Sequence, residues 1–229
     1  RRARLGLAVL LGPALVFLLL TNTRSAILGA AIGLIVVAVL QRSLRMLVAL
    51  GLAGAVGIAL VPAVGERFAL LAEERAVGGG PTGNTLEWRF GYWTEVLTLA
   101  NQNPVTGIGP NMTQRQTDEA KKPHNDFLRA YVETGVVGLL AYLALVVLMI
   151  RTGLVALRRA PPRGFARGVA IGFLGCAIAF VAVSAVSNVI SNVVTLWYLV
   201  AFAAVAGAVC RPAPRPAVAA AAGGSAGGP

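Results

Sequence analysis

Six long apolar runs constrain what this chain can fold into. They cover residues 5–20, 26–40, 44–64, 127–150, 168–187 and 193–209. A helix needs about 20 apolar residues to cross the hydrocarbon core of a bilayer, and each run reaches or approaches that length. Of the 229 residues, 57% are hydrophobic and only 13% are charged, which excludes a soluble globular domain and a disordered chain. We therefore expect an all-α, polytopic membrane protein with about six transmembrane helices.

The apolar runs divide the chain into four parts. We expect three transmembrane helices in residues 1–64, a long polar loop with amphipathic helices in 65–126, and three further transmembrane helices in 127–210. Residues 211–229 are rich in Pro, Ala and Gly and are expected to form a disordered tail. The first residue is Arg1 rather than Met, so we expect the chain to be a piece of a longer protein.

The distribution of basic residues orients these helices. The N-terminus, the connections around 41–45 and 151–167, and the tail carry twelve arginines and no acid. The other side carries eight basic residues and all nine acids of the chain. By the positive-inside rule the first side is cytoplasmic, so the tail is cytoplasmic and the loop 65–126 is extracytoplasmic. The net charge of +11 thus follows from topology, and we expect contact with membrane lipids and no nucleic acid.

Arg24 lies in the turn between the first two apolar runs. Those two runs and their turn span 36 residues, fewer than the roughly 40 that two full spans need. The turn is therefore drawn toward the depth of the lipid headgroups, where a cation is costly unless it meets an anion. Arg24 is thus a candidate for binding an anionic group, although it could instead reach a lipid phosphate as a snorkelling side chain.

An amphipathic helix is predicted over residues 86–100. Its apolar positions recur at intervals of four and three residues, at Leu86, Phe90, Trp93, Leu97 and Ala100. We expect this helix to lie on the membrane surface or against the bundle. Arg89 falls about 60° from the centre of the apolar stripe and is aimed partly inward. Its alternative role is that of a cation resting on Trp93.

His124 is the only histidine and comes just before the fourth apolar run. Asn125 and Asp126 are suited to the N-cap and first turn of the following helix, which places His124 at the positive end of the helix dipole. That position disfavours imidazolium, and a neutral imidazole is what a general base requires. The alternative is that His124 only enters the helix and that Asn125 and Asp126 are caps alone.

No metal site or cofactor is expected from the polar residues. One histidine, scattered carboxylates and no Asp-x-Asp pair are too few ligands for a metal ion. Cys176 and Cys210 lie in apolar runs and are expected to be inert packing residues.

Five short motifs, in three groups, carry a resemblance to a known family. Residues 23–26 read TRSA, 89–93 read RFGYW with NPVTGIGP at 103–110, and 123–128 read PHNDFL with ETGVVG at 133–138. The first group is similar to a Ser-Arg-Gly/Thr pattern of that family. The second is similar to its arginine and tryptophan with a later Pro-x-x-Gly-x-Gly, and the third to its His-Asn-x-x-Leu with Glu-x-Gly-x-x-Gly. Over about residues 20 to 205, the chain resembles the C-terminal half of the O-antigen ligase superfamily of bacterial membrane glycosyltransferases.

The resemblance implies a GT-C-like fold in the bacterial inner membrane and a metal-independent, inverting glycosyltransferase. It implies transfer of a polysaccharide from undecaprenyl diphosphate to a lipid A-core or similar acceptor on the extracytoplasmic face. Arg24 and Arg89 match arginines assigned to the diphosphate, and His124 matches the histidine assigned to acceptor activation. Trp93 and the residues Asn125 and Asp126 are expected to support this site. Arginine's fixed fork of donors suits a diphosphate, so no metal or cofactor is required.

Other functions share these features. An O-antigen polymerase or a protein O-oligosaccharyltransferase would use the same donor with another glycan or a protein as acceptor, and the motifs do not separate them. A membrane transporter or a noncatalytic membrane module is the alternative from another class. A transporter is expected to carry ionisable residues or broken helices near the membrane midplane, and the apolar runs contain almost none.

Overall fold

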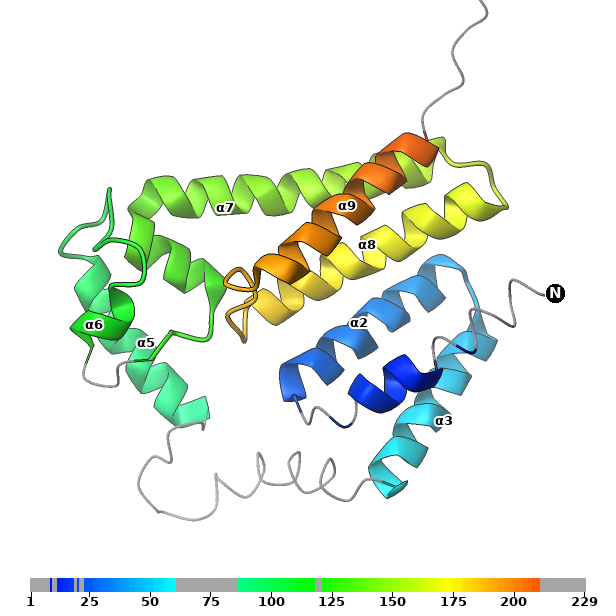
Figure 1. The fold of residues 1–229 in the computed structure, drawn as a ribbon, viewed down its shortest axis with the longest axis horizontal. Helices are drawn as coiled ribbons and strands as arrows, with labels where there is room; N and C mark the ends of the chain where they lie inside the picture. The colour runs from blue at the N-terminus through cyan, green and yellow to red at the C-terminus, as the bar shows by residue number, and fades with distance from the viewer. Residues whose placement is uncertain are drawn as a thin grey trace, which may run out of the picture.

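The computed structural model describes residues 9, 12–18, 20, 23–60, 86–117 and 121–210, and this part is all helical with connecting turns. Its helices are, in chain order, α2 (Arg24–Leu40), α3 (Leu44–Leu60), α5 (Leu86–Ala100), α6 (Thr113–Gln116), α7 (Asp126–Arg159), α8 (Phe165–Ser184) and α9 (Val193–Val209) (Figure 1). Residues 12–18 are also helical. The segment 61–85, residues 118–120, the tail 211–229 and part of the first apolar run lie outside the described residues, so the predictions made for them stay predictions.

Two of the described helices are long and apolar enough to cross a membrane. They are α7, with 34 residues, and α8, with 20. Helices α2 and α9 have 17 residues each, and α3 is a shorter apolar helix as well. The predicted all-α class is confirmed, whereas the number of six spans stays a prediction. The helix predicted over the apolar run 127–150 is longer than expected, because α7 continues to Arg159.

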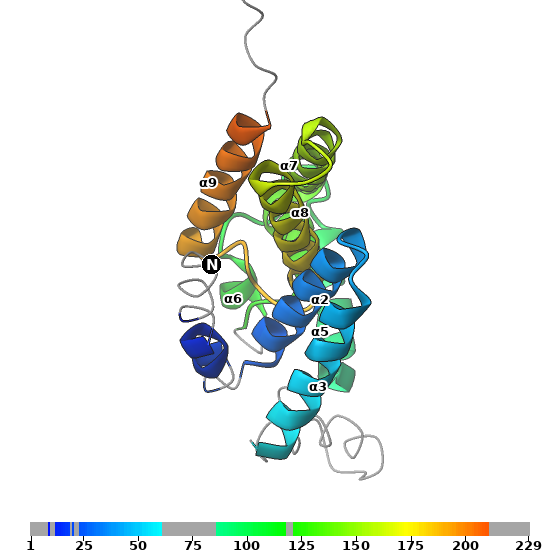
Figure 2. The ribbon, with the colours of Figure 1, turned by 90° about the vertical axis from the view of Figure 1, so that its right-hand side faces the viewer.

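Small residues bring α2 and α8 close together in an antiparallel pair. A Cβ atom added at Gly29 would lie 2.5 Å from Cγ2 of Val183, and one at Gly175 would lie 2.9 Å from the carbonyl oxygen of Gly33. Helices in membranes approach closely where such residues face each other. Helix α8 also contacts α7 and α9, and α2 contacts α3. Figure 2 shows α9 and α3 on opposite sides of the bundle, with α8 and α2 between them.

Helix α7 is broken at Gly135, whose φ of 66° and ψ of −167° are not helical. The loop at 104–109 fills the break and replaces helical hydrogen bonds with three of its own. These bonds join the amide of Ile108 to the carbonyl of Val132 at 2.9 Å, the amide of Gly109 to the carbonyl of Glu133 at 3.0 Å, and the amide of Val136 to the carbonyl of Pro104 at 2.8 Å. In an unbroken helix, the carbonyl of Val132 would accept from the amide of Val136. The two glycine-containing motifs at 103–110 and 133–138 therefore form one structural unit.

Two glycines allow this close approach of the loop to α7. At Gly135 a Cβ atom would lie 2.0 Å from the carbonyl oxygen of Val105, and the positive φ already disfavours other residues. At Gly107, where φ is 70°, a Cβ atom would lie 2.5 Å from the carbonyl carbon of Glu133. Both positions are closed to any side chain, which gives a physical reason for glycine in each motif.

Helix α5 packs on the start of α7 through a face that differs from the predicted stripe. Tyr92, Val96 and Ala100 are buried together with Val132 of α7. Ala100 belongs to the predicted stripe, whereas Phe90 and Leu97 of that stripe are 61% and 41% exposed, so of the two expected placements these two residues do not pack against the bundle. Tyr92 turns inward because its hydroxyl finds hydrogen-bond partners there, which the hydrocarbon stripe alone could not indicate. Contact of Phe90 and Leu97 with the membrane surface stays a prediction.

Candidate functional site

Two aromatic side chains of α5 hold the segment that leads to His124. The hydroxyl of Tyr92 forms a hydrogen bond with Oγ1 of Thr117 at 2.9 Å and donates to the carbonyl oxygen of Lys121. The indole Nε1–H of Trp93 donates to the carbonyl oxygen of Pro123, which is fully buried. Trp93 therefore contacts the residue next to His124, and its supporting role stays a prediction.

His124 is half-buried at the entry of α7, in a backbone conformation that a non-glycine residue rarely adopts. Its φ is 51°, and such outliers concentrate at sites where the surrounding structure holds the chain in place. Asn125 is the N-cap, as predicted, and its Oδ1 accepts from the amides of Phe127 at 3.0 Å and Leu128 at 3.1 Å. The cap on one side and the bond from Trp93 on the other hold the backbone of His124 between them.

Arg89 is half-buried and points toward the connection between α8 and α9. One guanidinium nitrogen donates to the carbonyl oxygen of Val186 at 3.2 Å. The Nε atom is buried and has no hydrogen-bond partner among the residues that the structure describes. Burial lowers the pKa of Arg89, and the positive charge of Arg24 lowers it further. The two guanidinium groups are thus near enough to repel each other, which makes the space around them favourable for an anion.

The imidazole of His124 shares this electrostatic environment. Burial is the main cause that lowers its pKa, and the charges of Arg89 and Lys121 lower it further. The predicted direction is confirmed, although burial and two neighbouring cations act here rather than the helix dipole alone. A histidine with a lowered pKa is neutral at pH 7 and can accept a proton.

The structure thus brings together the three residues singled out from the sequence. Arg24 begins α2, Arg89 lies on α5, and His124 precedes α7. They are far apart in the chain, yet the charge of Arg24 acts on Arg89 and the charge of Arg89 acts on His124. Their convergence follows from the packing of α5 on α7 and of α2 on α8.

Asp126 has a structural role in the same region. It is fully buried, and its Oδ2 accepts from the amides of Val189 at 2.9 Å and Ile190 at 3.0 Å. These amides belong to the α8–α9 connection, whose Val186 carbonyl accepts from Arg89. The predicted first-turn position of Asp126 is confirmed, and its carboxylate fixes the segment against which Arg89 lies.

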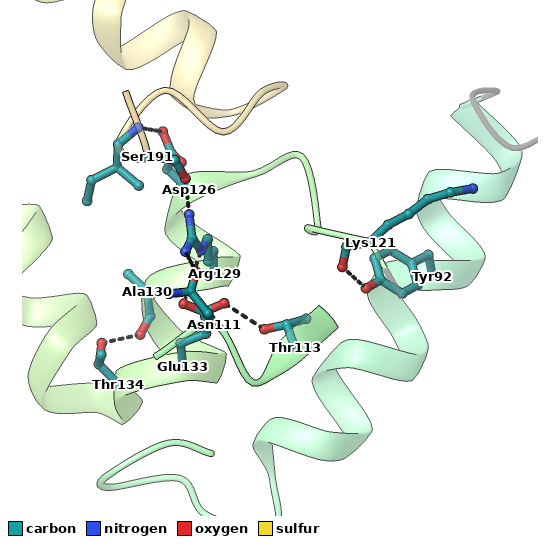
Figure 3. Close-up of polar contacts among 11 residues, drawn as sticks. Tyr92, Asn111, Thr113, Lys121, Asp126, Arg129, Ala130, Glu133, Thr134 and Ser191 are labelled. Carbon is teal, nitrogen blue, oxygen red and sulfur yellow. Dashed lines mark hydrogen bonds and ion pairs between the residues drawn. The ribbon is translucent and has the colours of Figure 1, made fainter. Parts of the chain in front are cut away.

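One polar cluster near the site was not predicted. Figure 3 shows Arg129 between Ser191 on one side and the side chains of Asn111 and Glu133 on the other. Arg129 pairs with Glu133 at 3.1 Å, donates to Oδ1 of Asn111 at 2.8 Å, and donates to Oγ of Ser191 in the α8–α9 connection. Glu133 also accepts from Oγ1 of Thr113 at 3.0 Å. The sequence feature that could have indicated this cluster is the opposite-charge pair Arg129 and Glu133, four residues apart at the start of an apolar run.

An apolar groove opens beside the arginines. It has a volume of about 770 Å³ and lies between α2, α8 and α9. Polar residues that include Ser25, Asn188 and Asn192 line one part, and apolar residues such as Val37 and Phe202 line the rest. Oδ1 of Asn188 is buried without a partner in the described part of the chain. Because Ser25 follows Arg24 directly, the polar end of the groove adjoins the cationic site.

The fold and this site define an all-helical membrane protein with two clustered arginines and a histidine of lowered pKa at one end of its bundle. The O-antigen ligase family matches residues 7–143, which is more than half of the chain, and the chain belongs to this family. The matched region contains Arg24, Arg89, His124 and both glycine-containing motifs. The family is a glycosyltransferase-like one shared by O-antigen ligases and polymerases, and it implies lipid-linked glycan substrates. No curated protein matches the chain.

Proposed function

We propose that the chain transfers a glycan from undecaprenyl diphosphate to a lipid A-core acceptor, as an O-antigen ligase of the bacterial inner membrane. The observation that carries the proposal is the convergence of Arg24, Arg89 and His124 beside an apolar groove. The reaction takes place on the extracytoplasmic face. In support, α5 lies at the opposite end of the bundle from the arginine-bearing connections of α2–α3 and α7–α8 (Figure 1).

Arg24 and Arg89 bind the diphosphate of the donor. An anion between them relieves their mutual repulsion, and the unpartnered Nε of Arg89 supplies a donor toward it. Guanidinium groups bind phosphate oxygens in a bidentate manner. In the transition state, negative charge develops on the departing diphosphate, so fixed cations at that point lower the barrier.

His124 activates the acceptor. Its neutral imidazole takes the proton from the acceptor hydroxyl while that oxygen attacks the anomeric carbon of the donor sugar. The new bond joins the acceptor oxygen to the anomeric carbon, and the bond to the diphosphate oxygen breaks. Undecaprenyl diphosphate leaves, and the configuration at the anomeric carbon is inverted.

The groove between α2, α8 and α9 accommodates the start of the polyprenyl chain. Its polar end adjoins Arg24, and its apolar part runs along α2 as far as Val37. A carrier with its diphosphate at the arginines would therefore enter apolar surroundings directly. This arrangement separates the charged head of the donor from its hydrocarbon tail in the way a lipid-linked substrate requires.

The acceptor decides between the enzymes that share this donor. A polymerase would transfer the glycan to a second lipid-linked glycan, and a protein O-oligosaccharyltransferase would transfer it to a serine or threonine hydroxyl. A transporter or a noncatalytic module would transfer the glycan to no acceptor. Arg24, Arg89 and His124 would serve the three enzymes equally, so the acceptor must be varied in the test.

The test is transfer by the full-length protein in proteoliposomes with an undecaprenyl diphosphate-linked glycan as donor. Lipid A-core, a second lipid-linked glycan and an acceptor protein are supplied separately. We expect glycosylated lipid A-core, little product with the other acceptors, and unchanged transfer in EDTA, because the two arginines supply the charge. The variant Arg115→Ala, which changes an exposed arginine outside the site, is the matched control and should stay active.

Three outcomes would overturn parts of the proposal. Product only with a lipid-linked glycan or a protein would replace the ligase by a polymerase or an oligosaccharyltransferase. Loss of transfer in EDTA, restored by a divalent cation, would contradict the role of the arginines. No transfer to any acceptor by a folded protein that still binds the donor would favour the noncatalytic alternative.

A further inference from the structure

A second cationic site lies at the other end of the bundle. The connection between α2 and α3 and the connection between α7 and α8 meet there, opposite α5 and α6 (Figure 1). Between them is a cavity of about 930 Å³. Three arginines line it, Arg42 from the first connection and Arg163 and Arg167 from the second. None of them belongs to the glycan-transfer site.

The packing of the helices explains why these arginines gather. Because α2 and α8 are antiparallel and in close contact, the last turn of α2 faces the first turn of α8. Helices α7 and α8 are both long and apolar enough to span a membrane, so the segment that joins them lies at a membrane face. Leu40, Leu157 and Ile171 line the same cavity and give it an apolar part next to its charged part.

The cavity holds positive charge that nothing in the described chain neutralises. No acidic side chain lines it among the residues that the structure describes. Within that same part of the chain, the side chains of Arg42, Arg163 and Arg167 form no ion pair and no hydrogen bond. Like charges gathered at a membrane face repel one another, and an anion between them is the simplest source of compensation.

The positive-inside rule alone does not account for this arrangement. It requires arginines on one side of the membrane but does not require them to share a cavity. Arg45 and Arg158 also lie near this end of the bundle and are exposed, as Arg42 and Arg163 are, but neither lines the cavity. The two groups of arginines therefore differ in whether they line one cavity with apolar side chains beside them.

We propose that this cavity binds the headgroup phosphate of an anionic phospholipid. The guanidinium groups of Arg163 and Arg167 bind the phosphate oxygens, for which their fork of donors is suited. The apolar side chains beside them contact the start of the acyl chains. Basic pockets between transmembrane helices bind anionic headgroups in this manner. The site is independent of glycan transfer, and its failure would leave the proposed function untouched.

In the test, the full chain is purified in detergent and titrated with phosphatidylglycerol or with phosphatidylcholine. Native mass spectrometry then measures how much of each lipid stays bound. We expect the unaltered protein to retain phosphatidylglycerol in preference to phosphatidylcholine. The double variant Arg163→Gln with Arg167→Gln should weaken that retention by about an order of magnitude. The matched double variant Arg45→Gln with Arg158→Gln removes the same charge outside the cavity and should retain the lipid.

A steric variant separates the cavity from its charge. Gly168 lines the cavity, and a Cβ atom added there would meet nothing within 4 Å. Gly168→Trp therefore fills the cavity without changing the net charge, and it should lose the retained phosphatidylglycerol. Retention after Gly168→Trp, or equal loss in the two double variants, would show diffuse attraction and overturn the proposal. Displacement of the lipid by inorganic phosphate at matched ionic strength would overturn the lipid assignment in favour of a free phosphate site.

Discussion

The two ends of the helical bundle both carry arginines, but the chain surrounds them differently. At one end Arg89 is half-buried with an unpartnered Nε, and a strained His124 and an interlocked loop lie beside it. At the other end Arg42 and Arg163 are exposed on short connections and line an open cavity. Charge alone does not distinguish the two ends. Burial and the unpartnered Nε of Arg89 distinguish the first end, for which we propose glycan transfer, from the second, for which we propose a membrane ligand.

The largest expected difference between the two ends is the effect on stability of replacing a glycine by alanine. Gly135→Ala places a methyl group 2.0 Å from the carbonyl oxygen of Val105 and forces alanine into a positive φ. We expect a loss of at least about 3 kcal/mol of stability, because strained backbone and steric overlap add. The measurement is thermal unfolding in detergent, together with glycan transfer, which should be lost.

Gly168→Ala is the matched variant at the other end. The added methyl group has open space, and alanine is favoured over glycine inside a helix by about 1 kcal/mol. Its unfolding temperature should therefore stay the same or rise. Equal destabilisation by both variants would show that the interlocked loop is no more demanding than an ordinary helical turn.

Asp126 tests whether the α8–α9 connection depends on a buried acid. Asp126→Ala leaves the amides of Val189 and Ile190 without their acceptor, and an unsatisfied buried donor costs about 1–3 kcal/mol. Unfolding in detergent should detect this loss. Arg158→Gln, an exposed change at the arginine-lined end, should stay within about 0.5 kcal/mol of the unaltered protein. A similar small effect for Asp126→Ala would remove its assigned role.

The smallest expected effect is a change in pH dependence. The lowered pKa of His124 keeps the imidazole neutral, and transfer active, to a lower pH than an ordinary histidine would allow. Lys121→Gln removes one cation that lowers this pKa, so the pKa rises and the acid limb of the rate profile moves to higher pH. Arg163→Gln, at the other end, should leave the profile unchanged. A shift to lower pH in Lys121→Gln would contradict the electrostatic role of Lys121.

The helices were largely predictable from the sequence because they depend on local composition. The apolar runs at 26–40 and 193–209 coincide with α2 and α9 to within two residues. The N-cap role of Asn125 was predictable for the same reason, since a cap is set by residues next to it in the chain. The candidate site residues were also indicated, because a cation or a single histidine near an apolar run is unusual.

The break in α7 and its partner loop were not predictable from local patterns. They depend on backbone hydrogen bonds between residues 24 to 32 positions apart, such as Ile108 and Val132, and no side-chain periodicity indicates such a pairing. The buried face of α5 was misplaced for a related reason. Tyr92 turns inward toward Thr117, a partner that lies outside its helix.

The most direct test of the central claim is a comparison of donor binding with transfer rate in His124→Asn, Arg89→Lys and Arg24→Lys of the full-length protein. Asparagine tolerates the left-handed backbone at position 124 but is a poor base. We predict that His124→Asn lowers the rate by about 10²–10⁴-fold and leaves donor affinity nearly unchanged. Both lysine variants should weaken donor binding despite their conserved charge, because an ammonium group loses the bidentate geometry. Near-normal transfer by His124→Asn, or normal donor binding when both arginines are replaced, would contradict a single site with these divided roles.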